Sequence, residues 1–186
     1  MQPQRLPPFR PEEAGENLKI KGAPANMAIE RVKDYFRTLG REEDVLEFPV
    51  SSATVELAAQ ALHTDPARIA KTISLYGEEG CILIVTAGDE KIDSGKFKRL
   101  FGKKAKMLAF EDVEPLTGHQ PGGVCPFANP ESARVYLDVS LQRFDTVYPA
   151  CGSSNSAIAL TCEELERFSG SLGWVDVCKG KTEAPV

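Results

Sequence analysis

The most constraining feature of the sequence is the unbroken apolar run Cys-Ile-Leu-Ile-Val-Thr-Ala at residues 81–87. A strand of this kind has no face that prefers water, so it has to be covered on both sides. The stretch 69–75 also has the composition of a strand, and Gly77 and Gly80 place a tight connection between the two. These residues therefore predict a hairpin near the middle of a sheet.

The remaining elements follow from apolar periodicity and turn residues. We expect helices at 29–39, 55–62, 92–101, 111–116 and 161–169. Short strands are expected at 45–50, 105–110, 134–139, 146–150, 157–160 and 174–178. The strands 146–150 and 157–160 should form a hairpin, and Thr161 with Glu164 should form a capping box. Together these elements predict an α+β (mixed α/β) domain with a strongly curved, mostly antiparallel mixed sheet of about seven strands and surrounding helices.

The length of 186 residues fits one domain. Residues 1–24 are rich in proline and lack apolar periodicity, which predicts a loose N-terminal arm. We expect the domain itself to span residues 25–180 and residues 181–186 to form a loose tail.

Charge and cysteine content narrow the class of protein. The net charge of −5 argues against a general nucleic-acid binder, so contact with a polyanion would need a local basic patch. The five cysteines lack zinc-like spacing and are expected to be reduced thiols, mostly buried. No apolar segment is long enough to span a bilayer, and the N-terminus has no signal-peptide core. These observations predict a cytoplasmic protein without a membrane partner.

The familiar catalytic motifs are missing. The chain has two histidines, His63 and His119, and neither lies in a G-x-S-x-G context. The sequence shows no metal-ligand cluster, no P-loop and no dinucleotide fingerprint, so neither a metal nor a cofactor is expected. Cys125 and His119 could form a thiol nucleophile and its base on one loop, although no third orienting group is evident. His63 ends a predicted helix, where facing solvent is the usual role.

Residues 117–128, Thr-Gly-His-Gln-Pro-Gly-Gly-Val-Cys-Pro-Phe-Ala, form the most unusual loop of the chain. Pro121 and Pro126 fix φ and donate no backbone N–H. Gly122 and Gly123 admit positive φ and let a ligand approach the main chain closely. Such a loop can bind a small polar ligand through main-chain groups alone. A tight turn that joins two strands is the alternative interpretation.

Two groups of cations also stand out. Lys71 lies at the entry to a predicted buried strand, where an ammonium is costly unless it meets an anion or reaches back to solvent. Residues 91–106 carry seven positive charges against a single acid, Asp93. This patch could bind an RNA backbone by counterion release, or it could be a solvated helix face. Its aromatic residues are Phe97 and Phe101 alone, so base stacking is not indicated.

With Lys71-Thr72 and the G-x-x-x-P pattern from Gly122 to Pro126 both present, the chain resembles the YbaK/prolyl-tRNA synthetase associated editing domain family. The resemblance runs from residue 28 to residue 178. Five segments look like the family's motifs, in the family's order: 54–59 (the helix start before the lysine), 69–72 (the K-T strand), 93–102 (the basic helix), 118–127 (the loop) and 147–160 (the final hairpin). Each motif alone is weak evidence for the family, whereas five motifs in the family's order are specific evidence for it.

The resemblance implies a YbaK-like fold and a trans-editing activity. The reaction would be hydrolysis of the ester that joins a wrong, small amino acid to the 3′-terminal adenosine of a tRNA, with tRNA-Pro as the foremost substrate. Backbone groups and the substrate's own ribose hydroxyl would replace a catalytic triad, and the catalytic residues would be Lys71, Gly122 and Gly123. The residues implied to line the substrate pocket are Thr54, Thr72, His119, Pro126, Gly152, Ser153 and Asn155. Those implied to meet the tRNA backbone are Lys96, Lys98, Arg99, Lys103 and Lys104.

The implied partner is the acceptor end of an aminoacylated tRNA, with a synthetase as a further partner and no DNA. The turn at residues 151–155 differs from that of relatives that remove cysteine or alanine, which leaves the amino acid open. Because the implied mechanism needs few side chains, a non-catalytic domain that senses aminoacyl groups or tRNA stays as the alternative function.

Overall fold

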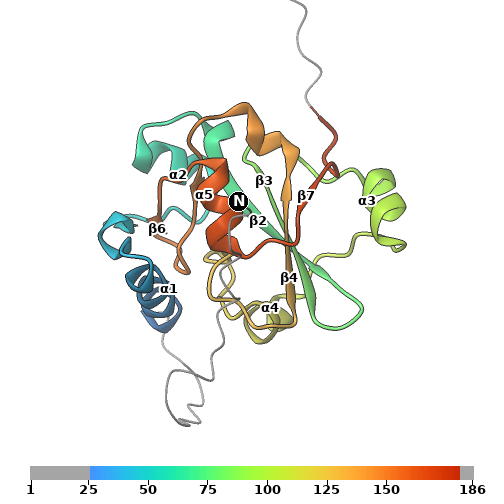
Figure 1. The fold of residues 1–186 in the computed structure, drawn as a ribbon, viewed down its shortest axis with the longest axis horizontal. Coiled ribbons are helices and arrows are strands. Elements are labelled where there is room, and N and C mark those ends of the chain that lie inside the picture. Colours follow the sequence, from blue (N-terminus) through green and yellow to red (C-terminus); the bar gives the residue numbers. More distant parts are fainter. Residues whose placement is uncertain (1–25, 181–186) are drawn as a thin grey trace, which may run out of the picture.

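The computed structural model describes residues 26–180 of the chain. The predicted N-terminal arm at 1–24 and tail at 181–186 lie outside the described residues. Within the described part, five α-helices and seven strands are present, and no helix there is long and apolar enough to cross a membrane. Figure 1 shows the strands at the centre, with α3 on one flank and α1 and α2 on the other.

The seven strands divide between two sheets. The larger sheet has the order β5-β2-β3-β4-β7, with bounds Tyr148–Pro149, Ile69–Tyr76, Cys81–Ala87, Ala133–Asp138 and Trp174–Val175. The smaller sheet pairs β1 (Leu46–Glu47) with β6 (Ser156–Ala157). The central β2–β3 hairpin is confirmed, and β3 is buried along its whole length.

The mixed α+β architecture is confirmed, but the strand directions correct the expectation. In the larger sheet β2–β3 is the antiparallel pair, whereas β2–β5, β3–β4 and β4–β7 are parallel. Parallel neighbours need long crossover connections, and the segment between β3 and β4 supplies one that includes both α3 and α4. The sheet is therefore mixed rather than mostly antiparallel.

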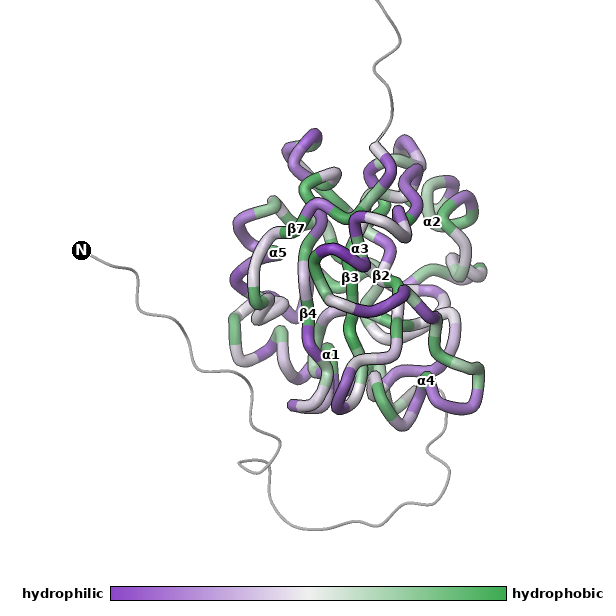
Figure 2. Tube along the Cα trace, turned by 90° about the vertical axis from the view of Figure 1, so that its right-hand side faces the viewer, coloured by the Kyte–Doolittle hydropathy of each residue, from purple (hydrophilic) through white to green (hydrophobic). Residues whose placement is uncertain are grey.

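Side chains of β2 and β3 alternate between two cores, as the pleat of a strand requires. On one face, Leu83 and Val85 pack with Val32 and Phe36 of α1 (Asn26–Thr38) and with Leu165 of α5 (Cys162–Ser169). This face also receives α4 (Phe110–Thr117) through Val113. In Figure 2 the tube is green, and therefore hydrophobic, along much of the central sheet.

The other face of the sheet carries the remaining two helices. Leu75, Ile82 and Ile84 pack with Phe97 of α3 (Ser94–Phe101). At the start of β2, Ile69 packs with α2 (Val55–Leu62) through Ala58 and Ala59. Both helices therefore cover the face opposite to α1 and α5.

Three local expectations change in the structure. The strand expected at 105–110 is wrong: Met107 makes only an isolated bridge with Leu75, and helix α4 already begins at Phe110. The segments 146–150 and 157–160 do pair antiparallel: Val147 and Leu160 exchange two backbone hydrogen bonds, and Ile158 N–H donates to Pro149 O. The strands β5 and β6 within them nevertheless join different sheets. The strand expected at 174–178 is limited to two residues. The capping box of Thr161 and Glu164 is confirmed.

Candidate functional site

The glycine loop, residues 118–128, connects helix α4 to strand β4, so it is not a turn between two strands. Helix α4 ends on Gly118, which adopts φ of 78° and donates its N–H to the carbonyl of Glu114. A second tight turn follows, in which Gly123 N–H donates to the carbonyl of Gln120 over 3.0 Å and Gly122 has φ of 88°. Gly122 is exposed and Gly123 is buried. The main chain at Gly122 is thus presented at the surface on a fixed support.

The support is His119, which is fully buried inside the loop. Its Nε2 lies 2.8 Å from the carbonyl oxygen of Phe127, so this nitrogen carries the proton and joins the two ends of the loop. Burial lowers the pKa of His119 to about 4, and the imidazole is therefore neutral at neutral pH. The sequence placed His119 in the pocket lining; the structure places it behind the loop.

Cys125 is also fully buried, with Sγ 3.4 Å from Nε2 of His119. Burial raises the pKa of this thiol to about 12. A nucleophilic cysteine has to be a thiolate that substrate can reach, and Cys125 meets neither condition. The Cys125–His119 pair therefore holds the loop and does not form a nucleophile and base.

The main chain of the loop packs directly against the main chain of the turn at residues 151–155. A Cβ added to Gly123 would lie 3.0 Å from the Cα and carbonyl carbon of Ser153. On the other side of that turn Gly152, at φ of 90°, approaches helix α1 so closely that an added Cβ would lie 2.9 Å from Ala28 O. Pro126 is buried beside Cys125. Glycine permits both close contacts, because an added Cβ would push the two backbones apart.

Hydrogen bonds join the segment that precedes α2 to the same turn. Asn155 exchanges two of them with Phe48: its Nδ2 donates to Phe48 O over 2.9 Å, and Phe48 N–H donates to Asn155 O over 2.7 Å. Ser52 N–H donates to Ser154 O over 2.6 Å. Ser153 Oγ lies 2.9 Å from Oδ1 of Asn155, so two of the predicted pocket residues contact each other directly.

Thr54 caps helix α2, where its hydroxyl accepts from Leu57 N–H, and it is exposed. The residue before it, Ala53, borders the loop: a Cβ on Gly122 would lie 3.5 Å from the Ala53 Cβ and 3.9 Å from the Ser154 Cβ. The structure therefore brings Gly122, Gly123, Gly152, Ser153, Asn155 and Thr54 into one continuous region.

Lys71 lies on the other face of the sheet. By strand alternation its side chain shares a face with Ile73 and Leu75, which pack under α3. Its Nζ donates to the carbonyl of Gly88 over 3.2 Å and to the carbonyl of Glu90. Burial is the main cause that lowers the pKa of Lys71. The head is thus held by main-chain carbonyls of the turn after β3.

The segment 53–55 links Lys71 to the glycine loop. Ala53 borders Gly122, and Val55 borders Gly88, whose added Cβ would lie 2.8 Å from Val55 Cγ1. Gly88 in turn accepts the hydrogen bond from Lys71. The lysine and the exposed glycine therefore flank the same three residues.

Thr72 follows Lys71 in β2, beyond the two residues of that strand that pair with β5. Ser74 O and Tyr76 N–H bond outward to Leu108 and Lys106, and Ala70 pairs with β5. By strand alternation, the N–H and C=O of Thr72 point to the same edge of β2 as those of Ser74 and Tyr76. Among the described residues, no strand pairs with Thr72 at that edge. The Thr72 hydroxyl oxygen is buried and lacks a hydrogen-bond partner within the described part of the chain.

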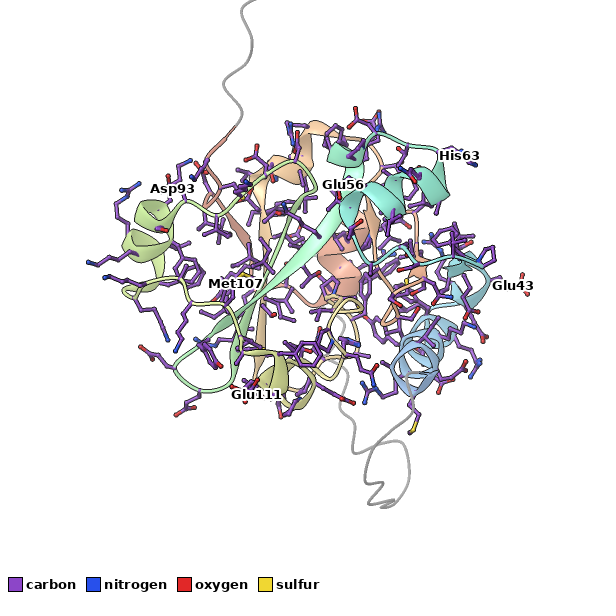
Figure 3. The ribbon with its side chains drawn as sticks, turned by 180° about the vertical axis from the view of Figure 1, so that it is seen from behind. Glu43, Glu56, His63, Asp93, Met107 and Glu111 are labelled. Carbon is purple, nitrogen blue, oxygen red and sulfur yellow. The ribbon has the colours of Figure 1, made fainter. Side chains whose placement is uncertain are left out.

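The predicted tRNA-backbone residues lie away from the loop. Figure 3 shows Asp93, the N-cap of α3, on one flank and His63, the C-cap of α2, on the other. Lys96 pairs with Asp176 over 2.8 Å, and Lys103 Nζ donates to Gly77 O over 2.9 Å. Lys98, Arg99 and Lys104 are exposed and join no ion pair among residues 26–180. His63 is exposed at the end of α2, as the sequence predicted.

Arg31 was not predicted to lie near the site. From helix α1 its guanidinium donates to the carbonyl of Gly118, the first residue of the loop. The two residues are 87 positions apart, and nothing local in the sequence signals the contact. The structure thus adds a cation at the loop that the motif search missed.

Comparisons with known proteins identify relatives of this chain. A model of the aminoacyl-tRNA editing domain matches residues 50–168. The chain is 54% identical over 154 residues to Uncharacterized protein YwhH of Bacillus subtilis (strain 168), a match that covers 82% of this chain and 98% of YwhH. It is 29% identical over 90 residues to the proline–tRNA ligase of Bacillus pumilus (strain SAFR-032), which covers 48% of this chain but only 16% of the ligase.

A solved structure of a proposed trans-editing enzyme for prolyl-tRNA synthetase superposes with a TM-score of 0.74 at 30% sequence identity. The match covers 86% of this chain and 100% of that one.

Proposed function

The chain belongs to the aminoacyl-tRNA editing domain family, and from this premise we propose that it is a free-standing deacylase that hydrolyses the ester of mischarged aminoacyl-tRNA. One observation carries the proposal: the exposed main chain at Gly122 is fixed from behind by buried His119 and by the backbone of residues 152 and 153. Fixed main-chain dipoles can stabilise developing charge without a titrating side chain. Such a site suits ester hydrolysis in a chain that lacks a triad.

The proposed substrate is a tRNA that carries a small non-cognate amino acid, with tRNA-Pro first. The small groups that border Gly122 support a small amino acid, because the atoms facing it are the Cβ carbons of Ala53 and Ser154. The similarity to proline–tRNA ligases and to a proposed trans-editing enzyme for prolyl-tRNA synthetase supports the choice of tRNA. Discrimination by one methyl or hydroxyl is worth only ~1–3 kcal/mol, so the pocket would accept more than one small amino acid.

In the proposed reaction, water attacks the ester carbonyl carbon and the bond to the ribose oxygen breaks. The ribose oxygen takes up a proton and the amino acid leaves as the free acid, while the neighbouring ribose hydroxyl orients the water. The exposed main-chain N–H of Gly122 would stabilise the oxyanion, Gly123 would hold the turn through its N–H on Gln120 O, and a loop carbonyl would accept from the α-amine. Lysine has three N–H donors; Lys71 uses two on Gly88 and Glu90, which leaves one for the terminal nucleotide.

The test is deacylation of a panel of tRNAs, tRNA-Pro among them, each charged with Ala, Cys, Ser, Thr or Pro. Wild type is compared with Lys71→Ala and with Lys91→Ala, an exposed lysine next to the turn whose carbonyls hold Lys71. We expect release from at least one mischarged pair, a loss of about 100-fold in Lys71→Ala, and little change in Lys91→Ala.

Two outcomes would contradict the proposal. Binding of tRNA without release from any pair would assign the chain to the sensor function. Loss of activity in Cys125→Ala that matches the loss in Lys71→Ala would point to a cysteine hydrolase, against the burial of that thiol.

A further inference from the structure

Helix α1 contacts both halves of the candidate site, the glycine loop and the turn at residues 151–155. A Cβ added to Gly152 of that turn would lie 2.9 Å from Ala28 O. Three positions further along α1, Arg31 donates a hydrogen bond from Nη2 to the carbonyl of Gly118, at the start of the loop. Residues three apart lie on the same face of a helix. One face of α1 therefore holds the turn and the loop at the same time.

The carbonyl of Gly118 lies at the C-terminal end of α4, where main-chain carbonyls lack partners within the helix. Arg31 supplies that partner from a different element, and its Nη2 would lie 3.3 Å from a Cβ added to Gly118. The other side-chain hydrogen bonds of the loop, within the described part of the chain, are internal or come from the flanking residues Thr117 and Asn129. The hydrogen bond of Arg31 thus ties the loop to α1.

The guanidinium of Arg31 is exposed and joins no ion pair among residues 26–180. No carboxylate there competes with Gly118 O for its N–H groups. Burial is the main cause that lowers the pKa of His119 to about 4, and the positive charge of Arg31 adds to it. A charged donor makes a stronger hydrogen bond to a carbonyl than a neutral donor does. The contact is therefore well suited to fix the base of the loop.

The exposed main chain at Gly122 lies four residues beyond Gly118 and faces Ala53 and Ser154. An N–H group stabilises an oxyanion only when it points to the position where the charge develops. A misplacement of about 1 Å can lower the rate by about 100-fold. The base of the loop therefore has to be fixed relative to the turn at residues 151–155, and α1 contacts both.

We propose that Arg31 is a positioning residue of the reaction site: its hydrogen bond to Gly118 O holds the glycine loop in register with the turn at residues 151–155. This inference rests on the proposed function, because it assigns Arg31 a role in that reaction. Arg31 lies outside residues 50–168, which match the model of the editing domain. The role therefore belongs to helix α1 of this chain and not to the matched segment.

Deacylation kinetics test the role with three variants. Arg31→Gln is expected to lower kcat by about tenfold and to change KM by less than about twofold, because it moves the loop without removing a group that binds substrate. Arg31→Lys keeps a charged donor and should stay within about threefold of wild type. Arg37→Gln is the matched control: Arg37 is exposed on the same helix and pairs with Asp34 and Glu42, so kcat should stay within about twofold of wild type.

Amide hydrogen exchange tests the same contact without any substrate. The N–H of Gly123, which donates to Gln120 O, should exchange about tenfold faster in Arg31→Gln than in wild type. The buried strand β3 should keep its protection, and the midpoint of urea unfolding should move by no more than about 0.5 M. These readouts separate a movement of the loop from a loss of global stability.

The proposal is overturned if the loop of Arg31→Gln exchanges as in wild type, or if exchange rises equally in β3. A lower kcat with unchanged exchange would also overturn it and would mean that Arg31 contacts the substrate directly. A higher KM at unchanged kcat would assign Arg31 to the attraction of RNA instead. If wild type releases no amino acid from any charged tRNA, the proposed function fails, and faster exchange in Arg31→Gln would still show that Arg31 holds the loop.

Discussion

The glycine loop and helix α3 present their polar groups in opposite ways. The loop exposes a main chain that buried contacts of His119, Gly123 and Gly152 hold in place. Helix α3 projects exposed side chains, among them Lys98 and Arg99, that make few contacts within the protein. The loop region therefore depends on geometry, and the helix depends on charge.

This difference decides how each region responds to mutation. A Cβ added at a closely packed glycine disturbs the loop, although it changes no charge. The exposed cations of the helix can be replaced one at a time, since any binding that they support is a sum over several screened charges. Mutations in the loop region should consequently have larger effects, and should act on stability and on rate together.

Gly152→Ala should have the largest effect. The substitution forces a non-glycine residue to φ of 90° and brings its Cβ to 2.9 Å from Ala28 O, so we expect a loss of about 4 kcal/mol in the free energy of unfolding. Gly170→Ala is the matched control, because Gly170 has φ of 60° with nothing within 4 Å of an added Cβ; it should cost about 1 kcal/mol. Urea unfolding measures both. Equal losses would mean that contact with α1 does not constrain the turn.

His119 should make the stability depend on pH. Its folded-state pKa of about 4 lies below the ordinary value of 6.5, so the unfolded chain binds more protons between those values. The stabilisation is fully present above pH 6.5 and is lost as pH falls toward 4, by about 3 kcal/mol in total.

Urea unfolding of wild type, His119→Gln and His63→Gln between pH 7 and 4.5 tests this expectation. His119→Gln should flatten the pH dependence, because its amide N–H can still donate to Phe127 O but does not titrate there. His63→Gln should retain the wild-type dependence, since His63 is exposed. A steep slope in His119→Gln would assign the pH dependence to other groups.

Gly123→Ala should act mainly on the reaction. Gly123 is not among the residues with positive φ, so alanine fits the local backbone. Its Cβ would nevertheless lie 3.0 Å from the main chain of Ser153, and the loop has to shift by a few tenths of an ångström. We expect kcat for deacylation to fall by about 10- to 100-fold, with a smaller change in KM. Pro121→Ala, at an exposed position of the same loop, should stay within about twofold of wild type; a similar loss there would show that the loop is sensitive everywhere.

The sequence predicted what local patterns determine. The β2–β3 hairpin and the Thr161 capping box were found because strand alternation and helix capping involve neighbouring residues. The burial of His119 was not found, because it depends on Phe127 and on α1 closing over the loop. Strand direction failed for the same reason: β5 and β6 have short sequences that fit several partners, and tertiary packing chooses among them.

The site shows the same division. Lys71 was identified from sequence as an unusual cation, yet its partners, the carbonyls of Gly88 and Glu90, lie 17 and 19 positions away and have no sequence signature. Trp174 was assigned to a strand without any role, and only the sheet order pairs it with Leu137 of β4. Chemistry-bearing residues can thus be listed from the sequence, whereas the contacts that orient them cannot.

The smallest effects are expected from single cations of the basic segment, and they differ in a way that the structure predicts. Removing Lys98, which is exposed, should lower the slope of log K against log salt for tRNA binding by about 0.7–0.9 and weaken binding a few-fold. Lys103→Gln should change the slope less, because Lys103 Nζ is held by Gly77 O. Filter binding at several salt concentrations measures both. Equal slopes for the two variants would mean that this carbonyl does not hold Lys103 away from RNA, and that the helix acts through total charge rather than through the placement of each cation.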